Sequence, residues 1–328
     1  MRLGVLDVGS NSVKLQVVDG RSGAPPLKTS AFKDTIRLAE CTDGDGAITD
    51  DGSARLVDAT KRAVAVADAQ GVTELIGFAT AAIRDARNGS ELCALLDHAA
   101  GVPLRALTGD DEARFTFLAA RRWFGWSAGP LLVLDIGGGS LEVACGRDEE
   151  PDVAVSLPLG AGRLTRDYLS EHPAPAADVE RVRHEARRRI ADVAERLRWE
   201  RRSQLEVGTS KTFEQLARLA GAPAARKGPF ARRSLERGDL KRLTQRLARM
   251  TEAERTTLRG VSRSRARQIL AGAIVAYEAM RAFDVDEIRI CPWALREGIL
   301  LRRLDRLHDP VEQHEAEIIA TATVDPQH

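Results

Sequence analysis

The sequence has little of what marks several common classes of protein. Aromatic residues make up only 4% of the 328 residues, which disfavours base stacking on nucleic acid. The formal net charge is +1, so no overall field attracts nucleic acid or a membrane surface. No window approaches the roughly 18 unbroken apolar residues of a membrane-spanning helix. We therefore expect neither nucleic acid nor a membrane among its partners.

Cysteine and histidine are also sparse. The four cysteines form no Cys-x-x-Cys pair, which argues against a zinc site or a disulfide framework and fits a reducing compartment. The six histidines lack the paired spacing of zinc hydrolases, and a phosphohistidine mechanism has no support. The N-terminus lacks the basic-then-apolar layout of a secretory signal. These absences lead us to expect a cytoplasmic protein.

What is present describes an ordinary globular chain, with 43% hydrophobic and 30% charged residues. A length of 328 residues exceeds what one hydrophobic core usually supports, so we expect two domains. We place them at residues 1–124 and 125–308, followed by a loose polar tail at 309–328.

An internal repeat supports this division. Residues 3–18 and 131–146 align without gaps and share the pattern L-x-V-L-D-[V/I]-G-x-x-S-[V/L]. Each copy is an apolar run, a turn of small residues and a second apolar run, which predicts a β-hairpin. The repeat indicates a duplication in which each domain opens with the same hairpin.

The rest of the chain alternates between helical and strand patterns. Apolar residues at helical spacing predict helices over 49–70, 111–123, 179–197 and 264–283. Short apolar runs at 75–79, 205–207 and 287–290 predict buried strands. We therefore predict an α/β fold.

The two hairpin turns are the leading candidates for a binding site. Glycine lets successive backbone N–H groups face one concavity, where an anion binds, and the leading Asp7 and Asp135 are placed to hold a hydrated divalent cation. One such turn alone is an ordinary hairpin, but two matched turns favour paired phosphate-binding loops. The predicted phosphate-binding residues of the turns are Gly9, Ser10, Asn11, Ser12, Gly137, Gly138, Gly139 and Ser140.

A third candidate segment, Gly208, Thr209 and Ser210, precedes a predicted helix, where N–H and hydroxyl groups attract anions. Ordinary helix capping explains it equally well. Basic residues suited to phosphate in the first domain are Arg37 and Arg84.

Two carboxylates are candidates for catalysis. Glu112 ends an acidic run, 110–112, that caps the predicted helix on the ordinary interpretation and otherwise supplies a base that directs water onto phosphorus. Glu142 lies two residues after the second turn, where it either polarises the water or binds metal.

Seven segments then occur in the order of a known family: LDVGSNSVKL, FATAAIRDARN, TGDDEAR, LDIGGGSLEV, LPLGAGRL, VGTSKTF and CPWALREGIL. The chain resembles the exopolyphosphatase/guanosine pentaphosphate phosphohydrolase (Ppx/GppA) family, particularly its short actinobacterial exopolyphosphatases. The resemblance implies two ribonuclease-H-like domains of the actin/Hsp70/sugar-kinase superfamily with an active site in the interdomain cleft. It also implies removal of the terminal phosphate of polyphosphate, or of the 5′-terminal phosphate of guanosine pentaphosphate, with Mg²⁺ or another divalent cation such as Mn²⁺.

The resemblance assigns roles to positions of this chain. Glu112 matches the catalytic glutamate, Glu142 the second catalytic acid, and Asp7 and Asp135 the metal-associated aspartates, while Arg84 matches an arginine near the bound phosphate. Four positions depart from the family pattern and leave the preference for chain length and nucleotide open: Lys14, Asp111, Leu141 and Lys211. The chain has no room for the extra C-terminal helical domain of longer relatives, so short polyphosphate is the expected substrate.

Other functions remain open at this point. The chain could instead act on guanosine penta- or tetraphosphate, or be a sensor that binds polyphosphate or an alarmone without turnover. It could also be a small-molecule kinase, or bind nucleic acid through the basic segments 181–202 or 226–233. A homodimer is expected only because dimers are common among soluble proteins.

Overall fold

The computed structural model describes residues 1–306 apart from 10, 21–25, 27, 37, 39–40, 81–82, 84 and 201–203. The predicted site residues Ser10, Arg37 and Arg84 and the predicted tail 309–328 therefore lie outside the described residues. In the part of the chain that is described, no helix is both long and apolar enough to cross a membrane.

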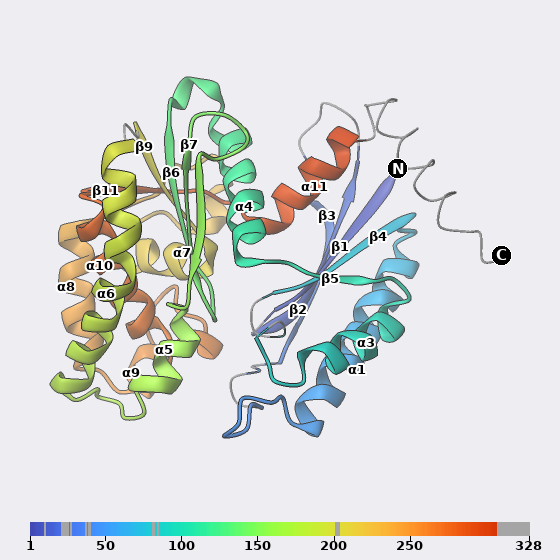
Figure 1. Ribbon diagram of the computed structural model, residues 1–328, viewed down its shortest axis with the longest axis horizontal. Coiled ribbons are helices and arrows are strands. Elements are labelled where there is room, and N and C mark those ends of the chain that lie inside the picture. The colour runs from blue at the N-terminus through green and yellow to red at the C-terminus, as the bar shows by residue number, and fades with distance from the viewer. Residues whose placement is uncertain are drawn as a thin grey trace, which may run out of the picture.

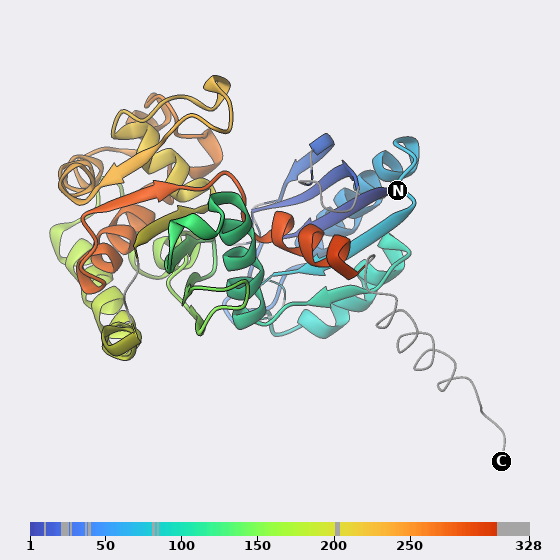
Figure 2. The same cartoon turned by 90° about the horizontal axis from the view of Figure 1, so that it is seen from above.

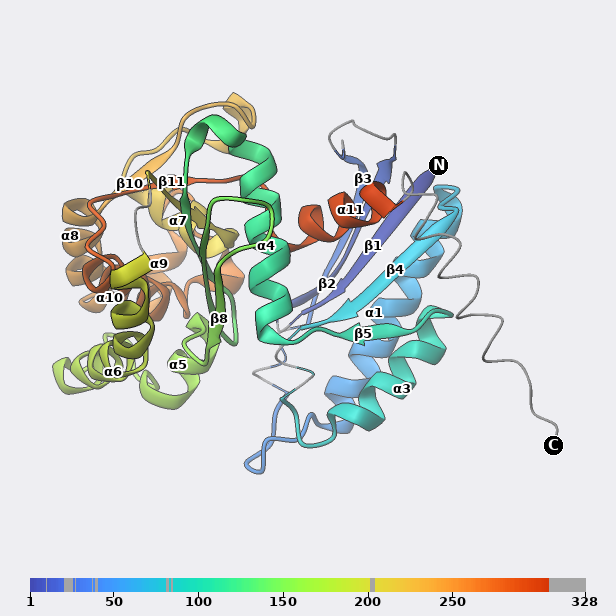
Figure 3. The same ribbon diagram turned by 45° about the horizontal axis from the view of Figure 1, so that its top comes forward.

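The first half of the chain forms a five-stranded sheet in the order β3-β2-β1-β4-β5. Its strands are β1 (Arg2–Val8), β2 (Ser12–Asp19), β3 (Lys28–Thr35), β4 (Glu74–Ala79) and β5 (Leu104–Ala106). Strand β2 runs antiparallel to both β1 and β3, whereas β4 and β5 extend the sheet in parallel from β1. Helices α1 (Asp50–Ala69) and α3 (Gly89–Ala100) cover one face of this sheet (Figure 3).

The second half repeats this plan and adds one edge strand, in the order β10-β11-β9-β6-β7-β8. Its strands are β6 (Leu131–Ile136), β7 (Leu141–Gly146), β8 (Val153–Leu157), β9 (Leu205–Thr209), β10 (Ser234–Glu236) and β11 (Glu287–Ile290). Strands β6, β7, β8, β9 and β11 take the places of β1 to β5 with the same relative directions. The predicted two-part α/β fold is confirmed, and the repeat seen in the sequence is a repeat of topology.

The helices of the second half pack around its sheet, with α6 and α10 side by side (Figure 1). They are α5 (Ala161–Tyr168), α6 (Ala176–Glu200), α7 (Ser210–Leu219), α8 (Arg237–Ala248), α9 (Glu252–Thr256) and α10 (Ile269–Ala282). The apolar stripe predicted along α6 is buried at Val182, Ala186, Ile190 and Leu197. The predicted helix 264–283 begins later, at Ile269, because residues 263–265 form a short 3-10 turn, η4 (Arg263–Arg265).

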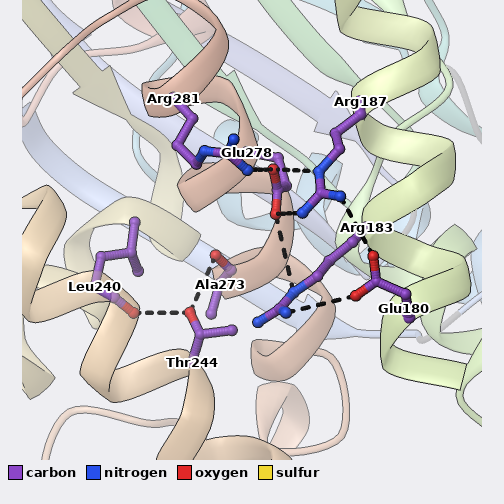
Figure 4. A network of polar contacts seen from close by, with 8 residues as sticks. All are labelled: Glu180, Arg183, Arg187, Leu240, Thr244, Ala273, Glu278 and Arg281. Carbon is purple, nitrogen blue, oxygen red and sulfur yellow. Dashed lines mark hydrogen bonds and ion pairs between the residues drawn. The ribbon is translucent and has the colours of Figure 1, made fainter. Parts of the chain in front are cut away.

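A buried carboxylate joins α6 to α10 (Figure 4). Glu278 is only 1% exposed, and both of its oxygens accept hydrogen bonds from Arg187, at 2.9 and 3.1 Å. Arg281 donates to it at 3.1 Å, and Arg183 approaches to 3.9 Å. Part of the basic segment 181–202 therefore holds two helices together.

Two helices lie between the sheets and tie the halves together (Figures 1 and 2). Helix α4 (Gly109–Phe124) packs across β6, β7 and β8, while α11 (Leu295–Arg306) packs against α4 and against β1. The two helices approach closely at Gly298, where a Cβ atom would overlap the carbonyl group of Phe115. Since α4 precedes residue 125 but packs on the second sheet, the boundary drawn at residues 124/125 stays a prediction.

Candidate active site

The β1–β2 and β6–β7 turns have the same local geometry. Gly9 donates its N–H to the carbonyl oxygen of Ser12 at 3.2 Å, and Gly137 donates to that of Ser140 at 2.9 Å. Both turns lie at the same end of equivalent strands, and both line one cleft of about 490 Å³ between the two halves. Asp7 and Asp135 therefore face a shared opening.

Most of the residues predicted from sequence line this cleft. They are Asp7, Gly9, Asn11, Ser12, Glu112, Asp135, Gly137, Gly138, Gly139, Ser140, Glu142 and Ser210. Thr209 lies behind the lining and donates its hydroxyl to Asp135 Oδ2 at 2.5 Å. Gly208 is placed elsewhere: it permits close packing, because a Cβ there would come within 2.7 Å of Ile288 and 2.9 Å of the Phe213 ring.

The two turns differ in the partner of their aspartate. In the first hairpin Asp7 pairs in register with Lys14, whose ammonium group lies 3.1 Å from its carboxylate. In the second hairpin Asp135 occupies the equivalent place, and its register partner is Glu142. Since Arg296 also approaches Asp7, to 3.8 Å, the first turn places cations beside its carboxylate, whereas the second brings two carboxylates together.

This like-charge pair changes the acidity of both groups. Burial and, next, the charge of the neighbouring Asp135 together raise the pKa of Glu142 to about 7, against hydrogen bonds from Ser140 and Ser156 that lower it. Burial also raises the pKa of Asp135, opposed chiefly by the Thr209 hydroxyl. Two buried carboxylates that repel each other are stabilised by any cation that binds between them.

The second turn is built on the start of α5. Ala161 and Arg163 donate their backbone N–H groups to the carbonyl oxygens of Gly137 and Gly138 at 3.0 and 2.9 Å. This approach requires Gly160, because a Cβ there would overlap the backbone of the turn. Among the described residues, Gly138 and Gly139 donate no backbone hydrogen bond, which leaves two N–H groups of a glycine turn for an anion.

Two residues of the acidic run at the start of α4, Asp111 and Glu112, have different roles. Thr108 and Asp111 form a reciprocal capping box, in which the Thr108 hydroxyl accepts from the Asp111 N–H at 3.1 Å and the Asp111 carboxylate accepts from the Thr108 N–H. Glu112, the next residue, is 7% exposed and lines the cleft. Capping and a cleft-facing carboxylate are therefore both present, at neighbouring positions.

Among the described residues, five cations line the cleft: Lys14, Lys33, Lys211, Arg265 and Arg296. Burial lowers the pKa of Lys33, and the charges of the other four cations lower it further. Burial also lowers the pKa of Arg265, against the attraction of Asp135. Such a concentration of positive charge around a small opening favours an anion with several negative charges.

Sequence reasoning missed Lys33, Arg265 and Arg296. Arg296 stands inside the segment CPWALREGIL, so that motif held a usable signal. Arg265 is the middle one of three arginines at alternate positions from 263 to 267, and nothing local separates it from its exposed neighbours. Lys33 comes from β3, a strand that the sequence pattern did not predict.

Polar contacts also connect the two walls of the cleft. Gln268 donates to Asn11 Oδ1 at 3.3 Å, and Arg163 bonds both Gly139 O and Asp85 Oδ2, at 3.1 and 2.9 Å. Ser210, at the start of α7, has a φ of 71°, an unfavourable conformation for a residue other than glycine. Asn11, Gly139 and Ser210 all line the cleft, so these constraints act at the site itself.

The donor set fits a divalent cation only in part. Among the described residues, no group of three or more carboxylate, histidine or cysteine side chains is arranged to hold a metal ion. Mg²⁺, however, binds through one or two carboxylates and takes its remaining ligands from water and phosphate. The Asp135–Glu142 pair meets that requirement, whereas Asp7 is already neutralised by Lys14.

Comparison with known proteins agrees with this fold. The model of the Ppx/GppA phosphatase family matches residues 17–307, and the chain belongs to that family. It is therefore an enzyme of a phosphate-hydrolysing class. The chain is 48% identical to exopolyphosphatase 1 of Mycobacterium tuberculosis over 98% of its own length and 94% of the relative. It is also 48% identical to exopolyphosphatase 1 of Mycobacterium leprae, over 93% and 90%.

Solved structures show the same fold. An exopolyphosphatase from Cytophaga hutchinsonii superposes with a TM-score of 0.84 at 23% identity, covering 93% of this chain and 98% of that one. The Ppx/GppA family member from Aquifex aeolicus superposes with a TM-score of 0.78 at 24% identity, covering 94% and 99%. The actin-like fold class predicted from sequence is confirmed.

Proposed function

We propose that the chain is a metal-dependent exopolyphosphatase that hydrolyses the terminal phosphate of inorganic polyphosphate. The observation that carries this proposal is the composition of the cleft, where two glycine-containing turns and five cations of the described residues surround a pair of repelling carboxylates. A linear polyanion with a divalent cation satisfies every one of these groups at once. The mycobacterial relatives carry the name exopolyphosphatase, which supports the same substrate.

In this proposal the first turn and the cations bind the polyphosphate near its end, while the second turn positions the terminal phosphate. Asp135 and Glu142 would hold Mg²⁺ or Mn²⁺, which supplies charge neutralisation at the phosphate oxygens. Glu112 orients a water molecule in line with the leaving oxygen and accepts its proton. The N–H groups of Gly138 and Gly139 stabilise the charge that develops on the transferred phosphoryl group.

The role of Glu112 is tested by Glu112→Ala. We expect this variant to bind polyphosphate as the wild type does and to release almost no phosphate, because a base acts in the transition state rather than in binding. Asp110→Ala is the matched control, since Asp110 is an exposed carboxylate in the same helical turn and does not line the cleft. Turnover by Glu112→Ala at the wild-type rate would eliminate the assignment.

Hydrolysis of guanosine pentaphosphate is the second candidate, and product analysis with both substrates side by side decides between them. A sensor that binds without turnover would release no phosphate at any metal concentration. The preference for short polyphosphate, the cytoplasmic location and the homodimer remain proposals based on sequence. Hydrolysis rates on polyphosphates of graded length test the chain-length preference, and a measurement of molar mass in solution tests the homodimer.

A further inference from the structure

A row of four polar side chains crosses the second sheet where it meets the cleft. In register, Thr209 of β9 lies opposite Asp135 of β6, Asp135 lies opposite Glu142 of β7, and Glu142 lies opposite Ser156 of β8. Register partners on neighbouring strands point to the same face of a sheet. The row therefore has the two carboxylates at its centre and one hydroxyl group at each end.

Each outer hydroxyl donates a hydrogen bond to the carboxylate beside it. Thr209 donates to Asp135 Oδ2 at 2.5 Å, and Ser156 donates to Glu142 Oε1 at 2.9 Å. The two carboxylates line the cleft, whereas the two hydroxyl residues stand outside its lining. A donor in a fixed place restricts the rotation of a carboxylate, and groups one layer behind a metal site orient its ligands in this way.

Thr209 occupies a position where a threonine hydroxyl usually caps a helix. It is the N-cap residue of α7, yet within the described part of the chain its side chain makes no capping hydrogen bond. Thr49, Thr108 and Thr251 hold the same position in α1, α4 and α9, and each accepts a backbone N–H of its helix. The Thr209 hydroxyl therefore serves Asp135 rather than the helix that it precedes.

Ser156 is fixed from its other side by the start of α4. A Cβ atom on Gly109, the first residue of that helix, would come within 2.3 Å of Ser156 Cβ and 2.7 Å of its Oγ. The helix backbone thus packs directly on the serine side chain, which limits where the hydroxyl can point. The same helix carries Glu112 into the cleft three residues later. Ser156 therefore bonds to Glu142 and packs against the helix that holds Glu112.

The equivalent row of the first sheet has a different composition. Its register partners across β4, β1, β2 and β3 are Phe78, Asp7, Lys14 and Lys33. These four positions hold one carboxylate and two cations, and none of them is a hydroxyl residue. Because the two halves share one topology, the outer hydroxyls accompany the carboxylate pair and are not a requirement of the repeated fold.

We propose that Ser156 and Thr209 are positioning residues, which orient the carboxylates of Glu142 and Asp135 toward a shared divalent cation. The proposal rests on the metal-binding role proposed above for these two carboxylates. It gives Thr209, a residue that the sequence suggested as a phosphate ligand, a different task. Neither hydroxyl contacts the polyphosphate, so both act through the carboxylate to which they donate.

The test measures the binding of Mn²⁺ to the protein without polyphosphate, by electron paramagnetic resonance of the free ion. Ser156→Ala and Thr209→Val each remove one hydroxyl with little change in shape. We expect each variant to bind Mn²⁺ about tenfold more weakly, as loss of a partner behind a metal site does elsewhere. Thr209→Ser keeps the hydroxyl and should stay close to the wild-type affinity.

Kinetics give a second readout. The Mg²⁺ concentration for half-maximal polyphosphate turnover should rise in Ser156→Ala and Thr209→Val by the same factor as the loss of Mn²⁺ affinity. The KM for polyphosphate at saturating Mg²⁺ should stay unchanged, because neither hydroxyl lines the cleft.

Thr244→Val is the matched control. Thr244 is buried in the same half of the protein and donates its hydroxyl to Leu240 O at 2.8 Å, away from the cleft (Figure 4). This variant loses a buried hydrogen bond of the same kind and should keep the wild-type Mn²⁺ affinity. Unchanged affinity in Ser156→Ala or in Thr209→Val would overturn the role of that residue, and an equal loss in Thr244→Val would overturn both roles. Absence of metal-dependent turnover in the wild type would instead contradict the proposed function, on which the positioning roles rest.

Discussion

The Asp135–Glu142 pair should lower the free energy of unfolding of the protein, and the size of this loss should depend on pH. The pKa of Glu142 rises from an ordinary 4.5 to about 7 on folding. Below pH 4.5 the carboxyl group is protonated in both the folded and the unfolded state, so it does not change the free energy of unfolding. Between pH 4.5 and about 7 the folded state keeps a proton that the unfolded state releases, so the free energy of unfolding falls as pH rises.

The size of the effect follows from the shift. A rise of about 2.5 pKa units at 1.36 kcal/mol per unit gives about 3 kcal/mol, reached above pH 7. Glu142→Gln removes the charge and keeps an acceptor for the Ser156 hydroxyl, which lies 2.9 Å from Glu142 Oε1. We therefore expect Glu142→Gln to raise the free energy of unfolding by up to about 3 kcal/mol near pH 8, and by close to zero near pH 4.

Urea unfolding at these two pH values, in the presence of a chelator, measures the difference. Glu171→Gln is the control, because Glu171 is an exposed glutamate outside the cleft. Addition of Mg²⁺ should stabilise the wild type and leave the variant unchanged, since a cation that binds the folded state shifts the equilibrium by mass action. The reasoning is refuted if Glu142→Gln changes stability equally at both pH values.

Three further outcomes follow from the structure. Gly160→Ala should reduce kcat at least tenfold in steady-state kinetics, because the added methyl group displaces the Gly138–Gly139 turn. Gly44→Ala is the control and should leave kcat unchanged, because Gly44 has open space around it. Lys33→Gln should raise KM for polyphosphate about tenfold with little change in kcat. The wild-type KM should itself rise as Lys33 loses its proton, at a lower pH than for an ordinary lysine, because the pKa of Lys33 is lowered. Glu278→Gln should lower the free energy of unfolding by about 1–2 kcal/mol in a urea titration, a modest loss because Arg187 and Arg281 are half exposed and regain water (Figure 4).

The fold was predictable from sequence because its signals are local. The Asp-Gly-Ser turns at residues 7–12 and 135–140 define hairpins, and their repetition defines the duplicated plan. Thr49 and Thr108 cap α1 and α4 as a sequence pattern indicates. Strand β3 was not predicted, because its sequence KTSAFKDT carries no clear alternation.

The site was predictable only where a residue adjoins one of these turns. Glu142 was found because it follows the second turn, and Glu112 because it belongs to a family motif. Arg265 contacts Thr212, 53 positions earlier in the chain, and such a contact leaves no local signature. Gly208 does not line the cleft: a glycine beside a helix start suggested an anion site, whereas the structure packs it closely against Ile288 and Phe213.

The placement of α11 has a consequence for how the chain acquires its structure. Leu3, Val5 and Val18 of the first sheet are fully buried, and the residues that cover them include Leu300 and Leu304 of α11. During synthesis this apolar face stays uncovered until α11 has emerged. A fragment that stops before α11 would expose the same face, so the first half should aggregate when expressed by itself.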